Sequence, residues 1–228
     1  MIKIGLALRL KHGRYNIADV NALSGLQGIV AEVHISSYRE FSDLYIGDIL
    51  DWLEELPLPI YAIKLPKIIE TEDLEKGVLI ADQVAAKYLI VESERGLHLD
   101  KESLRLLAEY GITLCLENPE GTPLTPQALK ASIEPCLALS YNLSGCRVDQ
   151  PVKEVIKYIG YVKVIRAFNV SNKGTRLPLF HPDGLWNLNR VVKLLSGLPR
   201  EILLILDYPS DVKTYVNEVN RIKELARA

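Results

Sequence analysis

The sequence of 228 residues has little of several features that mark particular protein classes. Its three cysteines, Cys115, Cys136 and Cys146, form no CxxC pair, so neither a disulfide framework nor a zinc knuckle is indicated, and reduced thiols are expected. Rossmann and P-loop glycine patterns are absent, which argues against a doubly wound nucleotide-binding sheet. No apolar run approaches the length of a membrane span, and no signal-like leader precedes the first run. We therefore expect a cytoplasmic protein with no membrane partner.

The chain also has no excess of charge of one sign, with a net charge of -2 at pH 7. A near-neutral balance produces no field that attracts polyanions, so nucleic acid is not an expected partner. Hydrophobic residues make up 48% of the sequence, which is enough to bury a large core. No Ser- or Pro-rich linker divides the chain, and residues 1–228 are interpreted as one domain.

What the sequence has is a regular alternation of apolar runs with stretches of helical periodicity. The runs begin near Ile2, Ile29, Ile60, Tyr88, Ile112, Cys136, Val162 and Glu201. Residues of N-cap type precede several of the helical stretches, among them Asp100 and the pair Ser210 and Asp211. This alternation predicts an α/β fold, a single (β/α)8 TIM barrel.

Almost every apolar run ends near a charged or amide-bearing residue. These residues are Arg9, Glu32, Lys64, Glu92, Glu117, Asn142, Arg166 and Asp207. In a closed parallel barrel the loops that follow the strands meet at one rim, so we expect these side chains to converge on one site there. Because side chains alternate along a strand, an inward Glu117 requires an inward Cys115, and Glu92 and Glu94 share a face in the same way.

The apolar run at 162–169 contains two polar residues, Arg166 and Asn169, that would lie on opposite faces of a regular strand. Both side chains can point inward only if a β-bulge lies between them. We favour an inward Arg166, since an arginine under the helical layer would be an unpaired buried charge. Tyr141 has outward parity and is expected in the core. His34 shares the inward face of Glu32, and its roles as a core histidine and as a ligand-binding group stay open.

The polar ring has two interpretations. One is a salt-bridge network of the kind typical of heat-adapted, thermophilic proteins. The other is a binding or catalytic site, which we favour, because buried ion pairs often cost as much free energy in desolvation as their attraction returns.

The segment from Asn172 to Asp183 is expected to be a structureless stretch. It contains Gly174 and the basic residues Lys173 and Arg176, a composition that suits a lid over the pocket. An ordinary exposed connection explains it equally well.

Four segments, in order, carry a resemblance to a known superfamily. They are LCLENPEG at the fifth run, LALSYNLSG at the sixth, HPDGLWNL after the seventh and ILLILDYP at the eighth. In these segments the chain resembles the xylose isomerase-like TIM barrels, which include sugar phosphate isomerases/epimerases and endonuclease IV-type (AP endonuclease family 2-like) enzymes.

The resemblance implies a divalent metal held at the ends of the last four strands. The positions that match the family's Glu, Asp, His and Glu ligands are here Glu117, Asn142, Asn169 and Asp207. Two carboxylates with two amide oxygens suit Mg or Mn better than Zn. The alternative is a metal-free site in which Lys64 or Arg166 supplies the positive charge.

The function that the resemblance implies is isomerase/epimerase chemistry on a small sugar or sugar phosphate, by proton transfer beside a carbonyl. Glu117, Asp207 and Lys64 are the expected catalytic residues. The expected substrate-binding residues are Arg9, Glu32, His34, Glu92, Asn118, Asn142, Arg166 and His181. The first alternative is a non-catalytic, ligand- or partner-binding barrel that has lost the metal site, and the second is an endonuclease IV-like nuclease. The oligomeric state stays open, a homo-oligomer included.

Overall fold

The computed structural model describes residues 1–17, 20–66, 71–92, 99–124, 128, 130, 134–146 and 151–227. Its main sheet contains β1 (Ile2–Lys11), β2 (Arg14–Tyr15), β3 (Ile29–Ile35), β4 (Ile60–Lys64), β5 (Tyr88–Glu92), β6 (Thr113–Glu117), β7 (Leu137–Asn142), β8 (Val162–Ala167) and β11 (Ile202–Leu206). Two short strands, β9 (Asn169–Val170) and β10 (Arg176–Leu177), pair with each other antiparallel. The observed strands begin within one residue of the predicted positions.

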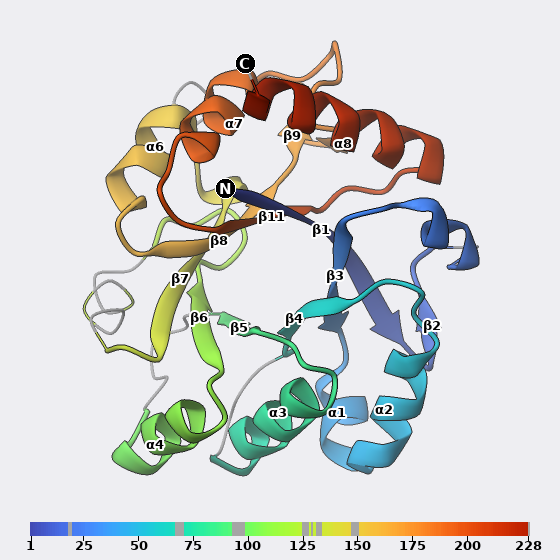
Figure 1. Cartoon of the computed structure of the whole chain (residues 1–228), viewed down its shortest axis with the longest axis vertical. Helices are drawn as coiled ribbons and strands as arrows, with labels where there is room; N and C mark the ends of the chain where they lie inside the picture. Colours follow the sequence, from blue (N-terminus) through green and yellow to red (C-terminus); the bar gives the residue numbers. More distant parts are fainter. Residues whose placement is uncertain are drawn as a thin grey trace.

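Helices follow the strands along the chain and lie around the outside of the sheet (Figure 1). They are α1 (Tyr38–Asp43), α2 (Ile46–Glu54), α3 (Thr71–Gln83), α4 (Lys101–Glu109), α6 (Pro151–Tyr158), α7 (Asn189–Ser196) and α8 (Val212–Arg227), with the 3-10 helices η1 (Asn21–Gly25) and η2 (Leu143–Gly145). Two predicted N-caps are confirmed. The side chain of Asp100 accepts the backbone N–H of Ser103 at 2.8 Å, and that of Asp211 accepts the N–H of Thr214 at 2.7 Å.

The sheet closes into a barrel of eight parallel strands, as predicted. Its strand order is β11-β8-β7-β6-β5-β4-β3-β1, with β2 added antiparallel to β1, and β11 pairs in parallel with β1 to complete the ring. All the barrel strands point the same way, so their carboxyl ends lie at one rim.

Because successive side chains point to opposite faces of each strand, the apolar residues form two layers, one inside the barrel and one outside it. The barrel interior contains Ala7, Val30, Ala62, Tyr88, Ile90, Cys115, Ala138, Val164, Leu203 and Ile205. A second, larger cluster packs on the other side of the strands against the helices, and Tyr141 belongs to it, as predicted. This apolar layer inside the barrel lies beneath the charged residues at the carboxyl ends.

The segment 172–183 is not structureless, and this expectation was wrong. β10 lies within it and pairs with β9, with Arg176 opposite Val170 and Leu177 opposite Asn169. The end of β8 at Ala167 also settles the parity problem, because Asn169 belongs to a different strand from Arg166.

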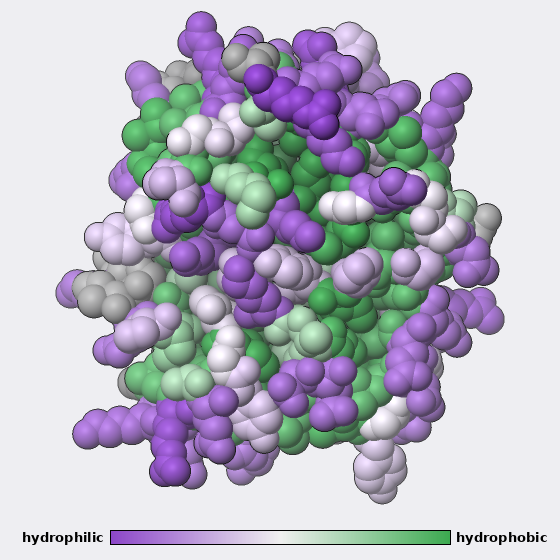
Figure 2. Space-filling view, viewed as in Figure 1, coloured by the Kyte–Doolittle hydropathy of each residue, from purple (hydrophilic) through white to green (hydrophobic). Residues whose placement is uncertain are grey.

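The surface contains both polar and apolar side chains (Figure 2). Figure 2 shows hydrophilic side chains across the face seen in Figure 1, with hydrophobic ones between them. Within the part of the chain that the structure describes, no helix is both long and apolar enough to cross a membrane.

Candidate functional site

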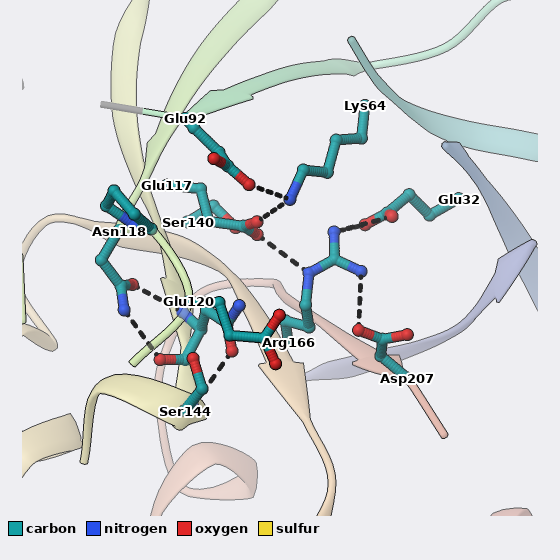
Figure 3. A network of polar contacts seen from close by, with 12 residues as sticks. Glu32, Lys64, Glu92, Glu117, Asn118, Glu120, Ser140, Ser144, Arg166 and Asp207 are labelled. Atoms are coloured by element: carbon teal, nitrogen blue, oxygen red, sulfur yellow. Dashed lines mark hydrogen bonds and ion pairs between the residues drawn. The ribbon is translucent and has the colours of Figure 1, made fainter. Parts of the chain in front are cut away.

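Arg166, near the end of β8, lies at the centre of a buried ion-pair network (Figure 3). One terminal nitrogen, Nη2, donates to both carboxylate oxygens of Glu32 at 2.7 Å. Nε donates to Oε2 of Glu117 at 3.1 Å, and Nη1 lies 3.4 Å from Oδ2 of Asp207. Three carboxylates from different parts of the barrel therefore surround one guanidinium whose side chain is 3% exposed.

Glu117, the last residue of β6, is fully buried and accepts hydrogen bonds from three side chains. Besides Arg166, these donors are Ser140 on β7, whose Oγ lies 2.8 Å from Oε2, and the ammonium of Lys64. Lys64 also donates to Glu92 at 3.2 Å. It therefore links the buried carboxylate to one that is partly exposed.

The two buried glutamates at the centre of the network differ in their pKa shifts. Burial acts to raise the pKa of both carboxyl groups. For Glu117 the charges of Arg166 and Lys64 outweigh burial, and its pKa lies below the usual value. For Glu32, burial and the neighbouring charge of Glu117 outweigh its contact with Arg166, and its pKa is raised. The pKa of Glu117 therefore leaves this carboxylate ionised at neutral pH.

Asp207 follows directly after β11 and contacts three arginines. Arg9 donates to Oδ1 at 2.6 Å, Arg176 donates to Oδ2, and Arg166 is the third. Burial acts to raise its pKa, but the charges of Arg166, Arg176 and Arg9 outweigh burial and lower the pKa of Asp207 to about 2. Asp207 is therefore also ionised at neutral pH.

Arg176 brings the β9–β10 hairpin against the network. Its guanidinium lies over the ring of Phe168, 4.3 Å from the centroid, and it also donates to Glu120 at 2.6 Å. Arg176 was expected only as a basic residue of a lid over the pocket, and Ser140 and Glu120 were not among the expected site residues. Ser140 could have been found from the sequence, because it shares the inward parity of Ala138 on β7, whereas Arg176 depends on the path of a hairpin.

His34 is half-buried on β3 and next to Arg9 in the β1–β3 register. Burial, helped by the charges of Lys64, Arg166 and Arg9, lowers the pKa of His34 to about 3. Its imidazole is therefore neutral at physiological pH, and it can both donate and accept a hydrogen bond.

The expected amide residues contact the backbone. Asn118 donates to the carbonyl of Asn142 at 2.9 Å and accepts its N–H at 2.8 Å, and the side-chain oxygen of Asn142 accepts the N–H of Ser144 at 3.0 Å. Both asparagines therefore fix the loops at the rim. A side chain at Gly145 would begin 2.6 Å from the amide nitrogen of Asn118, so the residue there must be glycine.

Asn169, the first residue of β9, also binds the backbone of a loop with its side chain. Its amide donates to the carbonyls of Leu179 at 2.8 Å and Trp186 at 2.9 Å, and its oxygen accepts the N–H of Trp186 at 3.0 Å. A Cβ at Gly184 would lie 2.3 Å from that amide nitrogen, which excludes any side chain there. Asn169 thereby closes the loop from β9 to α7.

His181 lies apart from the network. Its Nδ1 accepts the N–H of Asp183 at 3.2 Å, a contact within its own loop. The structure thus brings together Arg9, Glu32, Lys64, Glu92, Glu117, Arg166 and Asp207, with His34 beside them. Glu94, which was expected to share the inward face of Glu92, lies outside the described residues.

Comparison of the sequence with protein-family models and with curated proteins gives no match. Solved structures do match. A xylose isomerase domain protein from Planctomyces limnophilus superimposes with a TM-score of 0.65 at 12% identity, covering 99% of this chain and 97% of that one. The chain has the fold of the xylose isomerase-like TIM barrels.

Two further structures are informative about this fold. A protein from Thermus thermophilus, soaked with ZnCl2, matches with a TM-score of 0.64 at 14% identity, over 99% of this chain and 98% of that one. D-allulose 3-epimerase from Methylomonas sp., in complex with D-allulose, matches with a TM-score of 0.56 at 12% identity, over 99% and 93%.

The side chains at the expected metal position do not fit a divalent ion. The side-chain oxygens of Asn142 and Asn169 accept backbone N–H groups, and Glu117 and Asp207 are paired with cations. Among the described residues, no group of three His, Cys, Asp or Glu side chains is arranged to hold a metal. A dication about 4 Å from a guanidinium would be repelled by roughly 8 kcal/mol at an effective dielectric constant of about 20. We derive no catalytic step through a metal.

Proposed function

We propose that this chain is an isomerase or epimerase of a small, sugar-like carbonyl compound that acts at the carboxyl-terminal rim of the barrel. The observation that carries the proposal is the pair of ionised carboxylates, Glu117 and Asp207, joined through Arg166. Proton transfer beside a carbonyl requires an ionised carboxylate that removes the proton, and the same carboxylate, protonated by that step, can return it to the substrate. The similarity in fold to an epimerase with D-allulose bound supports a sugar-like substrate class.

In this proposal Glu117 removes the proton, and Lys64 polarises the substrate carbonyl. Without substrate, the ammonium of Lys64 is shared by Glu117 and Glu92. A carbonyl oxygen that attracts Lys64 weakens its contact with Glu117. Because the charge of Lys64 is one cause of the lowered pKa of Glu117, substrate binding raises that pKa and makes Glu117 a stronger base. Binding and activation of the base are thereby coupled.

On the other side of the network, the ionised Asp207 is the second carboxylate that can accept a proton, and the proton returned to the substrate comes from the carboxylate that removed one or from solvent. Arg9, with a side chain 38% exposed, and Glu92, at 37%, reach the open side of the site and are suited to binding substrate hydroxyls. The neutral imidazole of His34 complements them as a donor and an acceptor. Glu32 and Arg166 stay beneath and hold the carboxylates in place.

Exchange of substrate hydrogen with solvent tests the function even while the substrate is unidentified. The protein is incubated in D2O with a panel of aldoses, ketoses and their phosphates, and deuterium at the carbon beside the carbonyl is measured by NMR. We expect wild type to label at least one compound, and Glu117→Gln to lose roughly 10²- to 10⁴-fold of that rate while remaining folded. Glu54→Gln, an exposed glutamate on α2, is the matched control.

Retained exchange in folded Glu117→Gln would contradict the role of Glu117, and no exchange with any compound would contradict the enzyme proposal. The absence of exchange would favour a ligand-binding barrel. The complete burial of Glu117 also favours this second function. A thermal shift with the same panel identifies that case, because a ligand that binds only the native state raises the melting temperature whether or not it reacts.

A further inference from the structure

We infer that Ser140 is a positioning residue for Glu117, which fixes Oε2 of this carboxylate and leaves Oε1 as the oxygen that takes the substrate proton. The inference rests on the proposed function, because it divides the work of the base named there between its two oxygens. It also adds to the site a residue that acts through Glu117 rather than on the substrate.

The two oxygens of Glu117 have different partners. Oε2 accepts hydrogen bonds from Oγ of Ser140 at 2.8 Å and from Nε of Arg166 at 3.1 Å. A carboxylate oxygen has two lone pairs, so these two donors occupy both. Oε1 accepts the ammonium of Lys64, which also binds Glu92 (Figure 3). Within the described residues this contact uses one lone pair of Oε1 and leaves the other for a proton.

The pairing of the strands places Ser140 where it can hold Glu117. Ser140 lies opposite Glu117 in the β6–β7 register, and both side chains are fully buried. On the other side of β7 the register shifts between Leu139 and Ser140, so that Ser140 lies opposite Val164, a residue of the barrel interior. Paired residues of parallel strands point to the same face of the sheet, and Ser140 therefore enters the interior beside Glu117.

The hydroxyl of Ser140 is a polar group among apolar neighbours. Ala138 on the same strand and Val164 on the next belong to the apolar layer inside the barrel. An alanine at position 140 would continue this layer without desolvating a polar group. What the hydroxyl adds is the hydrogen bond to Glu117, which restricts rotation of the carboxylate and is one cause of its lowered pKa.

The proton transfer then uses the two oxygens differently. The C–H bond beside the substrate carbonyl breaks, its proton forms an O–H bond with Oε1, and the electron pair moves toward the carbonyl oxygen beside Lys64. Oε2 keeps its contacts with Ser140 and Arg166 during this step, so the carboxyl group does not turn as it loses its charge. The protonated Oε1 can return the proton to the substrate from the same position.

Ser140→Ala tests the inference, and Ser140→Thr, which keeps a hydroxyl on the same carbon, is the conservative variant. The rate of hydrogen exchange in D2O is measured against pH with the compounds that wild type labels. We expect Ser140→Ala to lose about 10-fold or more of the rate, because an unanchored carboxylate is misplaced. The acid limb of its pH profile should move to higher pH, because the ionised form of Glu117 loses a donor. Ser140→Thr should recover both properties. Ser42→Ala, at an exposed position on α1, is the matched control.

A titration without substrate separates the inference from the proposed function. The isotopically labelled carboxyl carbon of Glu117, assigned by comparison with Glu117→Gln, reports the pKa of this group by NMR. Ser140→Ala should raise that pKa. An unchanged pKa, or a rate and pH profile equal to those of an active wild type, would overturn the inference and leave the proposed function intact. If wild type labels no compound, the proposed function fails together with the role of Oε1, and the titration still decides whether Ser140 anchors Oε2.

Discussion

The carboxylate of Glu218 on α8 accepts the backbone N–H of Leu179 at 2.8 Å, and so attaches the loop between β10 and α7 to the last helix. The same carboxylate lies 3.4 Å from the N–H of Phe180 and 3.5 Å from the hydroxyl of Tyr208. Glu218 is 7% exposed, and its contacts are those of a side chain that satisfies buried donors. The hairpin that carries Arg176 is thus held from both ends, by Glu218 after it and by Asn169 at its start.

Glu218→Ala should destabilise the protein by about 1–3 kcal/mol, because it leaves the buried N–H of Leu179 without an acceptor. The measurement is urea denaturation followed by circular dichroism. Glu224→Ala, at an exposed position on the same helix, should change the free energy of unfolding by less than about 0.5 kcal/mol. Equal effects of the two substitutions would show that the attachment contributes nothing.

Acid should destabilise the protein through Asp207. The pKa of its carboxyl group is about 2 in the folded state and 3.8 as its ordinary value. A lowered pKa gives stability that is present above pH 3.8 and is lost as the pH falls toward 2, by about 2 kcal/mol in total. The melting temperature measured from pH 5 to pH 2 should fall steeply below pH 4.

The slope below pH 4 should be smaller in Asp207→Asn, although that variant starts from a lower stability. Glu32 contributes with the opposite sign. Its raised pKa gives stability at low pH that is lost as the pH rises through its folded-state value. An identical slope in wild type and Asp207→Asn would assign the acid sensitivity to other groups.

Lys76 on α3 should stabilise the end of α1. Its ammonium donates to the backbone carbonyls of Phe41 and Leu44 and lies 5.2 Å from the centroid of the Phe41 ring. Lys76→Met should keep the packing of the side-chain stem but lose these contacts, at a cost of about 1 kcal/mol or more. Thermal denaturation of Lys76→Met beside Lys153→Met, an exposed lysine on α6, measures the difference. A melting temperature unchanged from wild type would argue against the cap.

Much of the fold could be predicted because two local sequence patterns determine it. The period-2 alternation placed Ala7, Cys115 and Ile205 inside the barrel and Tyr141 outside it, and N-cap chemistry placed the starts of α4 and α8. Convergence of the charged strand ends also followed from the topology alone. These features depend on neighbours in the sequence or on a rule common to all parallel barrels.

The partners within the site could not be predicted in the same way. An amide side chain at a strand end can form the same hydrogen bonds with a ligand or with the backbone of a loop. Only the path of the loops determines that Asn118 and Asn169 bind backbone groups. Arg176 reaches Asp207 because β10 pairs with β9 in one particular register. The four bridges of Arg166 and Lys64 to Glu32, Glu92 and Glu117 depend on side-chain reach across the barrel.

The pair of Arg166 and Glu32 has a consequence for how the chain folds. The two residues are 134 positions apart in the sequence, so they meet only when the first and second halves of the barrel have closed on each other. Until then each half carries charged groups on the surface that will become its interior, and these groups remain hydrated. We therefore expect these groups to keep an incomplete barrel from collapsing onto itself or onto another copy, with desolvation of the network as a late step of folding. Arg166→Met should then accelerate the formation of compact intermediates in stopped-flow refolding while it lowers the yield of native protein.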